Sequence, residues 1–435
     1  MGQSSSVVLF GAPGFTVTDV VDNAAEVVLK VELTDTVIGC TGCGVRAVVK
    51  DRRACHLRDA PSGDRPVRVV WNKRVWGCPD PDCDRKFWSE QAPDFVAPGA
   101  VLTVRAKQWA LARISNVEMS VAAIARVFGV SWSTVWAAVV EQGKPLIDAP
   151  DRVGVTPQIG FDETVMQPAG RRRRRRFITS VVDIFTSQII DIFEGHDAAE
   201  LDRWLSKQSL AWRASVAVVS IDPHEGYRKS LLGSLFLNDD LMLVVDPFHI
   251  VKLANEAVTK VRLRTQNETL GHRGRTGDPL YGARKLMLIG EERLDAKGKE
   301  RLLTIFQSHD PKGELFDAWH GKEKVRAIYL TKTRAEALVK LNDAISFCCH
   351  HLSGPELQTL GKTLKKWGPE ILARHETGAS NGKVEAANLL IKQIKRAGRG
   401  FRNLHNYRLR ILLAGGLPCQ TQQVTKLRPK PRLIA

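Results

Sequence analysis

Apolar side chains change their spacing along the chain, and each spacing predicts a different kind of structure. Between Ser120 and Gln142 they recur every three or four residues on both sides of Gly129, which predicts two short helices joined by a tight turn. Ala125 lies where the helices would touch, and the expected inner faces consist of Val121, Ile124, Trp132, Val135 and Ala138. This is helix-turn-helix spacing, and the residues expected to meet a DNA major groove are Ser131, Ser133, Thr134 and Trp136. A helical hairpin without DNA contacts is the alternative.

A second pattern begins after the Pro- and Gly-containing linker at residues 143–157. It predicts three strands in QIGFDETV, RFITSVVDIF and QIIDIFEG, a helix in AAELDRWLSKQSLAW, and two buried strands in ASVAVVSID and LMLVVDPFHI. A three-stranded meander followed by parallel strands that alternate with helices is the order of a ribonuclease-H-like α/β fold. From about Val251 to Thr377 the spacing is helical throughout, which predicts an all-helical insertion at about 255–375.

Two aspartates end strands that would be neighbours in such a sheet. Asp162 ends the first predicted strand, and Asp222 ends the fourth. Because these strands lie side by side in a ribonuclease-H-like sheet, we expect both carboxylates within reach of shared divalent cations. Asp246 also ends a predicted strand and is the alternative to Asp222. Asp183 and Asp191 lie inside strands, and we expect their side chains to face outward.

A third carboxylate is expected from a helix around residue 385. The apolar stripe of this helix consists of Val384, Ala387, Ile391 and Ile394, and the neighbouring stripe carries Glu385, Asn388 and Lys392. Glu385 would then face the rim of the sheet and complete a metal site with Asp162 and Asp222. Three carboxylates carry charge −3 and two Mg2+ ions carry +4, so the loaded site would attract the phosphates that the carboxylates alone repel.

The cysteines suggest a separate metal site. Four of the eight form two close pairs, Cys40-x2-Cys43 and, 34 residues later, Cys78-x4-Cys83. Each pair could offer two thiolates to one tetrahedral Zn2+, which is a zinc-ribbon pattern with a long insert. Cys55 and His56 in the insert could replace a ligand. Four unrelated reduced thiols are the alternative to a metal site.

The formal net charge of +17 on 435 residues indicates a polyanionic partner. Twelve Lys and Arg residues follow residue 382 against the single acid Glu385, and nucleic acid is their expected partner, with a solvated basic tail as the alternative. The DNA contacts expected there come from Lys392, Lys395, Arg396, Arg399 and Arg402. The arginine run 171–176 forms either a solvated hairpin tip or phosphate contacts. The apolar runs are too short for a membrane span and no secretory signal is visible, so we expect a cytosolic protein.

Four segments follow the cysteine pairs and the helix-turn-helix in this order: GFDE, SIDPHEGY, DPFHIVKLANEA and SNGKVEAANLLIKQIKRAGRGF. Through them the chain resembles transposases of the ISL-three family of bacterial insertion sequences, from about Cys40 to Leu413. The resemblance places the family's catalytic DDE triad on Asp162, Asp222 and Glu385. Asp246 and His249 resemble the D-x-x-H element of related transposases, and we expect them, with Asn388, to support the site.

These patterns predict an N-terminal segment (1–35), a zinc-ribbon-like domain (36–95), a helix-turn-helix domain (100–148), a catalytic domain (155–413) and a basic tail (414–435). The expected function is that of a DDE transposase, which binds the terminal inverted repeats of its element, cleaves DNA and joins the ends to a target. It would use two Mg2+ per active site, with Mn2+ as a substitute, and one Zn2+. Its partners would be double-stranded DNA and a second copy of the chain, at the bacterial nucleoid and with no membrane. A non-catalytic zinc and helix-turn-helix regulator and a hydrolytic nuclease are the alternatives.

Overall fold

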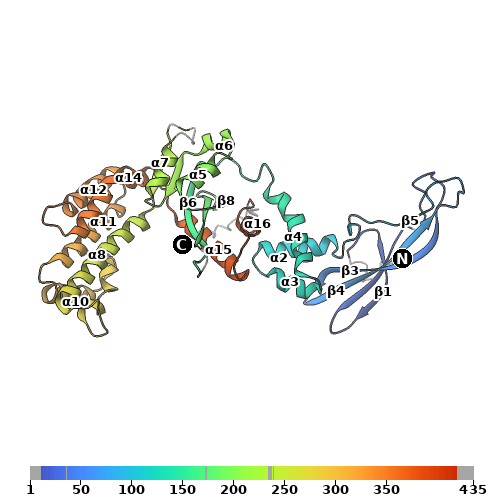
Figure 1. Cartoon of the computed structure of the whole chain (residues 1–435), viewed down its shortest axis with the longest axis horizontal. Helices are drawn as coiled ribbons and strands as arrows, with labels where there is room; N and C mark the ends of the chain where they lie inside the picture. The colour runs from blue at the N-terminus through green and yellow to red at the C-terminus, as the bar shows by residue number, and fades with distance from the viewer. Residues whose placement is uncertain (1–10, 36, 172–173, 234–237, 239, 419–435) are drawn as a thin grey trace, which may run out of the picture. The chain divides into compact units, whose positions relative to one another are not determined.

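The computed structural model forms two compact units (Figure 1). It describes residues 11–35, 37–171, 174–233, 238 and 240–418. The first unit comprises residues up to 152 together with 392–417, and the second is built from residues 153–391. In this described part of the chain, no single helix is long and apolar enough to span a membrane.

A five-stranded sheet opens the first unit. Its strands are β1 (Phe15–Asp22), β2 (Val27–Leu33), β3 (Val48–Ser62), β4 (Arg65–Gly77) and β5 (Phe87–Ser89). The order is β1-β2-β4-β3, and β5 also pairs with β4. Strands β3 and β4 form a long antiparallel hairpin, whereas β2 runs parallel to β4. The first 35 residues, for which the sequence predicts no element, therefore contribute two strands to this sheet.

Four helices follow in the first unit: α2 (Val104–Ser115), α3 (Val121–Phe128), α4 (Trp132–Ile147) and α16 (Leu404–Gly415). Ser120 and Ser131 cap α3 and α4, because each side-chain oxygen accepts a hydrogen bond from a backbone N–H of the first turn. Gly129 ends α3 in the left-handed conformation, with φ 63°, which a side chain would disfavour. These local signals fix the turn that the sequence predicts.

Helices α3 and α4 meet at a bend of 112°. Four of the predicted inner-face residues are buried: Val121, Ile124, Val135 and Ala138. The prediction for Trp132 is wrong, because its side chain is 49 % exposed. Trp132 is the first residue of α4 and stacks on Trp136 one turn later, with ring centroids 5.7 Å apart. The helix-turn-helix is thus present with an aromatic pair at the start of its second helix.

The second unit is built around another five-stranded sheet. Its strands are β6 (Gln158–Gln167), β7 (Arg176–Asp183), β8 (Ile189–Glu194), β9 (Val218–Ile221) and β10 (Met242–Val245). The order is β10-β9-β6-β7-β8. Strands β6, β7 and β8 form an antiparallel meander, while β9 runs parallel to β6 and β10 runs parallel to β9. The predicted meander and the side-by-side first and fourth strands are both present. The connecting helices are α5 (Ala198–Leu205), α6 (Leu210–Ser215) and α7 (Glu225–Leu232).

Two aspartates of this sheet do not face outward as predicted. Asp183 is buried, and its carboxylate accepts hydrogen bonds from the N–H groups of Phe185 and Thr186 and from the Thr186 hydroxyl. Asp191 is half-buried and accepts a hydrogen bond of 3.0 Å from the indole N–H of Trp204. Both acids therefore bind local donors, which the flanking apolar residues in the sequence do not reveal.

After β10 the chain is helical to residue 377. The helices are α8 (Pro247–Leu270), α9 (Pro279–Gly282), η1 (Leu286–Leu288), η2 (Glu291–Arg293), α10 (Ala296–His309), α11 (Glu314–Tyr329), α12 (Arg334–Cys348), α13 (Pro355–Lys366) and α14 (Gly368–Thr377). The whole range 247–377 is described and contains no strand, as the helical spacing predicts (Figure 1). Helix α15 (Gly382–Ala397) follows and leads back into the first unit.

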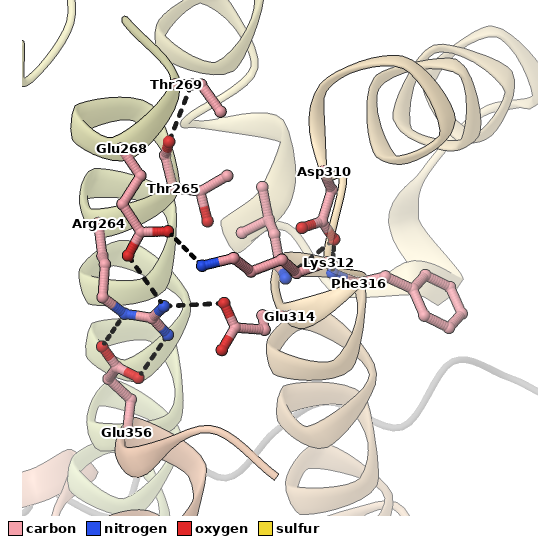
Figure 2. A network of polar contacts seen from close by, with 10 residues as sticks. Arg264, Thr265, Glu268, Thr269, Asp310, Lys312, Glu314, Phe316 and Glu356 are labelled. Carbon is pink, nitrogen blue, oxygen red and sulfur yellow. Dashed lines mark hydrogen bonds and ion pairs between the residues drawn. The ribbon is translucent and has the colours of Figure 1, made fainter. Parts of the chain in front are cut away.

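A cluster of charged side chains links three of these helices (Figure 2). The Arg264 guanidinium on α8 makes two hydrogen bonds of 3.0 Å to Glu356 on α13 and one of 2.8 Å to Glu314 on α11. Beside it, Lys312 donates a hydrogen bond of 2.8 Å to Glu268 of α8. The bonds to Glu356 and Glu314 raise the pKa of Arg264, which stabilises its charged form. A bidentate arginine–carboxylate pair fixes orientation as well as distance, so Arg264 determines how α8, α11 and α13 pack.

We predict that Arg264→Met lowers the free energy of unfolding by about 1–3 kcal/mol, because two partly buried carboxylates lose their shared partner. Denaturant titration followed by circular dichroism measures this change. Arg301→Met, which removes an exposed arginine of α10, is the matched control and should change stability by less than about 0.5 kcal/mol. Equal losses in the two variants would contradict a stabilising role for the cluster.

Candidate active site and metal centre

Asp162 lies in the middle of β6 and not at its end as predicted, because the strand continues to Gln167, and neighbours from a strand and a helix orient its side chain. The side-chain amide of Asn388 on α15 donates a hydrogen bond to Asp162 Oδ2, and the Glu163 N–H donates one of 2.6 Å to Oδ1. The hydroxyl of Ser180, which is the register partner of Asp162 on β7, lies 3.1 Å from Asn388 Oδ1. Burial, and after it the negative charge of Asp222, raises the pKa of Asp162 to about 6. The two aspartates therefore lie close enough to interact electrostatically.

A second group of ionisable side chains lies where β9 and β10 end. His249 Nδ1, in the first turn of α8, lies 3.0 Å from Asp222 Oδ1 and 3.4 Å from Asp246 Oδ2. Burial alone would lower the pKa of His249, but the two carboxylates raise it to about 10. The imidazole is thus protonated at neutral pH, and its positive charge offsets part of the negative charge of Asp222.

Asp222 and Asp246 differ in what their carboxylates already bind. Asp246 is 4 % exposed, and its oxygens accept hydrogen bonds from the N–H groups of Phe248 and Asn381, at 3.1 and 3.2 Å. The Asp246 carboxylate thus caps α8 and binds the backbone just before α15. The Asp222 side chain is 34 % exposed, and its Oδ1 lies 3.0 Å from the imidazole Nδ1 of His249. Asp246 is therefore committed to the fold, whereas Asp222 can still bind a ligand.

Helix α15 carries Glu385 beside this site. Its predicted apolar stripe is buried along its full length: Val384, Ala387, Ile391 and Ile394. Gly160 of β6 permits this packing, because a Cβ at that position would overlap Val384. Glu385 is exposed, one turn before the Asn388 that bonds Asp162.

The three predicted catalytic carboxylates do not form a closed cluster. Among the described residues, only four cysteines place three or more metal-binding atoms all within 4.8 Å of one another. The structure thus brings Asp162 and Asp222 together and connects α15 to them through Asn388. The part of Glu385 as the third ligand stays a prediction.

Three further polar residues lie around the site, and the sequence patterns do not predict a role for them. Ser180 orients Asn388, and the signal for it is a serine on the strand that pairs with Asp162. Asn381 is buried, with both polar side-chain atoms lacking a hydrogen-bond partner in the described structure. Glu163 follows Asp162, and burial raises its pKa. Asn381 lies in the SNG segment shortly before Glu385, and Glu163 directly follows Asp162 in the GFDE segment. Their closeness in sequence to a candidate acid is the signal that could have identified them.

The four paired cysteines meet at the base of the β3–β4 hairpin, where Val48 pairs with Gly77. Their Sγ atoms all lie within 4.8 Å of one another, with 3.8 Å between Cys40 and Cys83 and 3.4 Å between Cys43 and Cys78. A tetrahedral Zn2+ with bonds of about 2.3 Å needs sulfurs about 3.8 Å apart, so the donor set fits zinc.

The insert between the two cysteine pairs is a β-hairpin, and the backbone around the cluster changes the pKa of its thiols. The insert of 34 residues forms the β3–β4 hairpin, which carries Cys55 and His56 outside the cluster. Backbone N–H groups of residues 43 and 42 lower the pKa of Cys40 to about 7, which favours the thiolate that a metal requires. Burial raises the pKa of Cys78.

The residues expected to read DNA lie at the start of α4. Ser133 is exposed, and Thr134 and Trp136 are half-buried. Ser131 is exposed as well, but its oxygen accepts the Thr134 N–H and lies 2.8 Å from the hydroxyls of Ser133 and Thr134. Ser131 thus stabilises the helix start, which leaves Ser133 as the hydroxyl most open to a DNA base.

Among the basic residues expected to contact DNA, four are exposed: Lys392, Arg396, Arg399 and Arg402. Lys395 is half-buried, and burial lowers its pKa. In the arginine run, Arg176 pairs with Glu194 across β7 and β8 at 2.6 Å, and residues 172–173 lie outside the described residues. Of the predicted tail, residues 419–435 also lie outside them.

Comparison with known proteins gives two family matches. A family model of ISL3 transposases, described as "Transposase", matches residues 159–411, and one described as "Helix-turn-helix domain of transposase family ISL3" matches residues 90–142. The chain is similar to the "Transposase for insertion sequence element IS1557" of Mycobacterium tuberculosis, with 25 % identity over 414 residues, 88 % of this chain and 86 % of the relative. It is also similar to the "Transposase for insertion sequence element IS1001" of Bordetella parapertussis, with 24 % identity over 390 residues, 88 % of this chain and 89 % of the relative. The chain therefore belongs to the ISL3 (ISL-three) family of insertion-sequence transposases.

Proposed function

We propose that this protein is a DDE transposase that binds the terminal inverted repeats of its element, cleaves DNA there and joins the ends to a target. The observation that carries the proposal is the electrostatic interaction of Asp162 on β6 with Asp222, which follows the neighbouring strand β9, and it is supported by the hydrogen bond from Asn388 of α15 to Asp162. The strand order β10-β9-β6-β7-β8, with three antiparallel strands followed by two parallel ones, supports a ribonuclease-H-like catalytic domain. Membership of the ISL3 family supports the same reaction.

The residues present fit a divalent cation. Burial, and after it repulsion by Asp222, raises the pKa of Asp162, and the Asp222 side chain is 34 % exposed. Asp162, Asp222 and Glu385 would hold two Mg2+ ions, or Mn2+ in their place, since hard cations prefer carboxylate oxygens. When bound, the ions would activate water or a DNA 3′-hydroxyl and stabilise the leaving oxygen of an in-line displacement.

The remaining polar residues position these carboxylates. Asn388 and Ser180 fix Asp162, so that the carboxylate cannot rotate away from Asp222. Protonated His249 holds Asp222 from the side of α8, while Asp246 connects the starts of α8 and α15. Such preorganisation allows a site to act without reorganising during the reaction.

The first unit supplies DNA recognition in this proposal. Cys40, Cys43, Cys78 and Cys83 bind one structural Zn2+, and the start of α4 reads the element's end. We propose that two copies of the chain act on a pair of element ends, in the bacterial cytoplasm at the nucleoid. Lys392, Arg396, Arg399 and Arg402 contribute phosphate contacts.

The catalytic residues can be tested by charge-neutral substitutions. We predict that Glu385→Gln, Asp162→Asn and Asp222→Asn each reduce cleavage of labelled element ends about a thousandfold or more, because each removes a metal ligand. Glu300→Gln, an exposed change on α10, is the control and should leave cleavage unchanged. Binding to the same DNA should persist in all variants.

Outcomes of this assay separate the alternatives. Loss of cleavage by Asp246→Asn but not by Asp222→Asn would move the second ligand to Asp246. Cleavage without joining would indicate a hydrolytic nuclease, and end binding without cleavage in wild-type protein would indicate a regulator. Near-normal cleavage by Glu385→Gln would contradict the proposed triad. Asp183→Asn is unsuitable as a control, because Asp183 is buried and bound to the β7–β8 turn.

For the zinc site, we predict that the purified protein contains about one Zn2+ per chain and that Cys78→Ser releases it. The base of the β3–β4 hairpin should then lose its stability, since the ion no longer links the two cysteine pairs. Metal analysis by mass spectrometry and limited proteolysis measure both effects. Cys55→Ser is the matched control and should retain zinc. Unchanged zinc content in Cys78→Ser would refute the assignment.

For DNA binding, we predict that the basic tail and α4 act differently. Truncation after Pro418 keeps α16 and removes four basic residues, so it should weaken binding to all DNA and reduce the salt slope by about three to four units. Ser133→Arg should weaken end-specific binding most. Fluorescence anisotropy on element ends and on random duplexes measures both. Equal losses on the two DNAs in both variants would contradict this division.

A further inference from the structure

A cavity of about 400 Å³ lies within the first unit, between the start of the helix-turn-helix and the segment that leads into α16. Its charged residues and tryptophans are Arg126, Trp132, Trp136, Arg399, Arg402 and Arg410. In the described part of the chain, no Asp or Glu lines it. A cavity of this size is typical of small-ligand sites, and its four arginines favour an anionic ligand.

Arg410 provides the strongest sign of a missing partner. Its side chain lies on α16 and is 3 % exposed, and its Nε and Nη2 have no hydrogen-bond partner among the described residues. Burial accordingly lowers the pKa of Arg410. Arg152, also buried in this unit, differs because it donates hydrogen bonds of 2.7 and 2.9 Å to the carbonyls of Ile147 and Gly416. A buried charged donor without a partner is costly, so a partner for Arg410 is to be sought in a ligand.

The two tryptophans define the other part of the ligand. Trp132 and Trp136 stack with ring centroids 5.7 Å apart and 23° between their planes. Although it is stacked on Trp136, the Trp132 side chain remains 49 % exposed, so it offers area to a further flat ring. Nucleic-acid bases stack on such aromatic platforms whatever their sequence.

We propose that this cavity binds one unpaired nucleotide of a DNA strand, with the base stacked on Trp132 and the phosphate bound by Arg410. The proposal rests on the proposed DNA-binding function and names a second kind of contact for it. An unpaired nucleotide is required because a base inside a duplex is stacked on its neighbours and does not offer its face. Arg399 and Arg402, at the same cavity, are placed to contact the adjoining phosphates.

The test uses the full-length protein and fluorescence anisotropy with three labelled probes: a strand of six thymidines, a base-free strand of equal length, and a blunt random duplex. Wild-type protein should bind the thymidine strand about tenfold more tightly than the base-free strand, because stacking contributes to the first alone. Trp132→Ala should remove this difference without changing the affinity for the base-free strand. Arg410→Met should weaken binding to both strands about tenfold, yet leave the melting temperature unchanged or higher.

Two controls make these results specific to the cavity. Phe87→Ala removes an exposed aromatic side chain of the same unit and should leave all three affinities unchanged. Arg152→Met removes a paired buried arginine and should lower the melting temperature, in contrast to Arg410→Met.

Several results would overturn the inference. They are equal affinity of wild-type protein for the thymidine and base-free strands, an effect of Trp132→Ala no larger than that of Phe87→Ala, or a melting temperature of Arg410→Met as low as that of Arg152→Met. If the protein still binds the duplex in these cases, the proposed nucleotide site is refuted but the proposed DNA-binding function is not. If wild-type protein binds none of the three DNAs, the proposed function fails with it.

Discussion

The parallel pairing of β9 with β6 is the constraint on which the candidate active site depends. Asp162 lies on β6 and Asp222 directly follows β9, and burial together with the charge of Asp222 raises the pKa of Asp162 to about 6. The charged form of Asp162 is therefore disfavoured, although the nearby His249 imidazolium offsets part of the repulsion. A divalent cation bound between the two carboxylates would remove their repulsion. We therefore explain the pairing of the two acids by metal binding and not by a contribution to folding.

The elements around this pair hold the carboxylates in place. Helix α8 begins at Asp246 and presents His249 to Asp222 from its first turn, so the long helical region starts directly at the site. Asp246 also binds the backbone at the start of α15, and Asn388 on that helix binds Asp162. Farther along α8, the Arg264 cluster fixes the packing of the helices that support it. The helical region is thereby coupled to the geometry of the carboxylates.

Sequence patterns predict the sheet order and the helix-turn-helix because both rest on local signals. Alternation of apolar residues marks β6 to β10, and Ser120, Gly129 and Ser131 mark the helix ends. The spacing of the cysteine pairs likewise anticipates their meeting at a hairpin base. These features depend on neighbours along the chain.

Features that depend on how side chains pack in three dimensions could not be predicted in the same way. The apolar character of Trp132 suggested burial, but its place at the start of α4 leaves it exposed beside Trp136. Asp183 is an acid in a strand, and only the turn that follows supplies its donors. The separation of Glu385 from the two aspartates depends on how α15 lies on the sheet, which its apolar stripe leaves open. The missing partner of Arg410 can be seen only once α16 is packed.

The most direct measurement of the central claim is anomalous diffraction from crystals of the protein bound to an element end in Mn2+. The proposal predicts Mn2+ density between Asp162 and Asp222, with Glu385 moved into contact with it and His249 still beside Asp222. Mn2+ bound elsewhere, or bound at this place by Asp246 instead of Asp222, would contradict the proposed catalytic site.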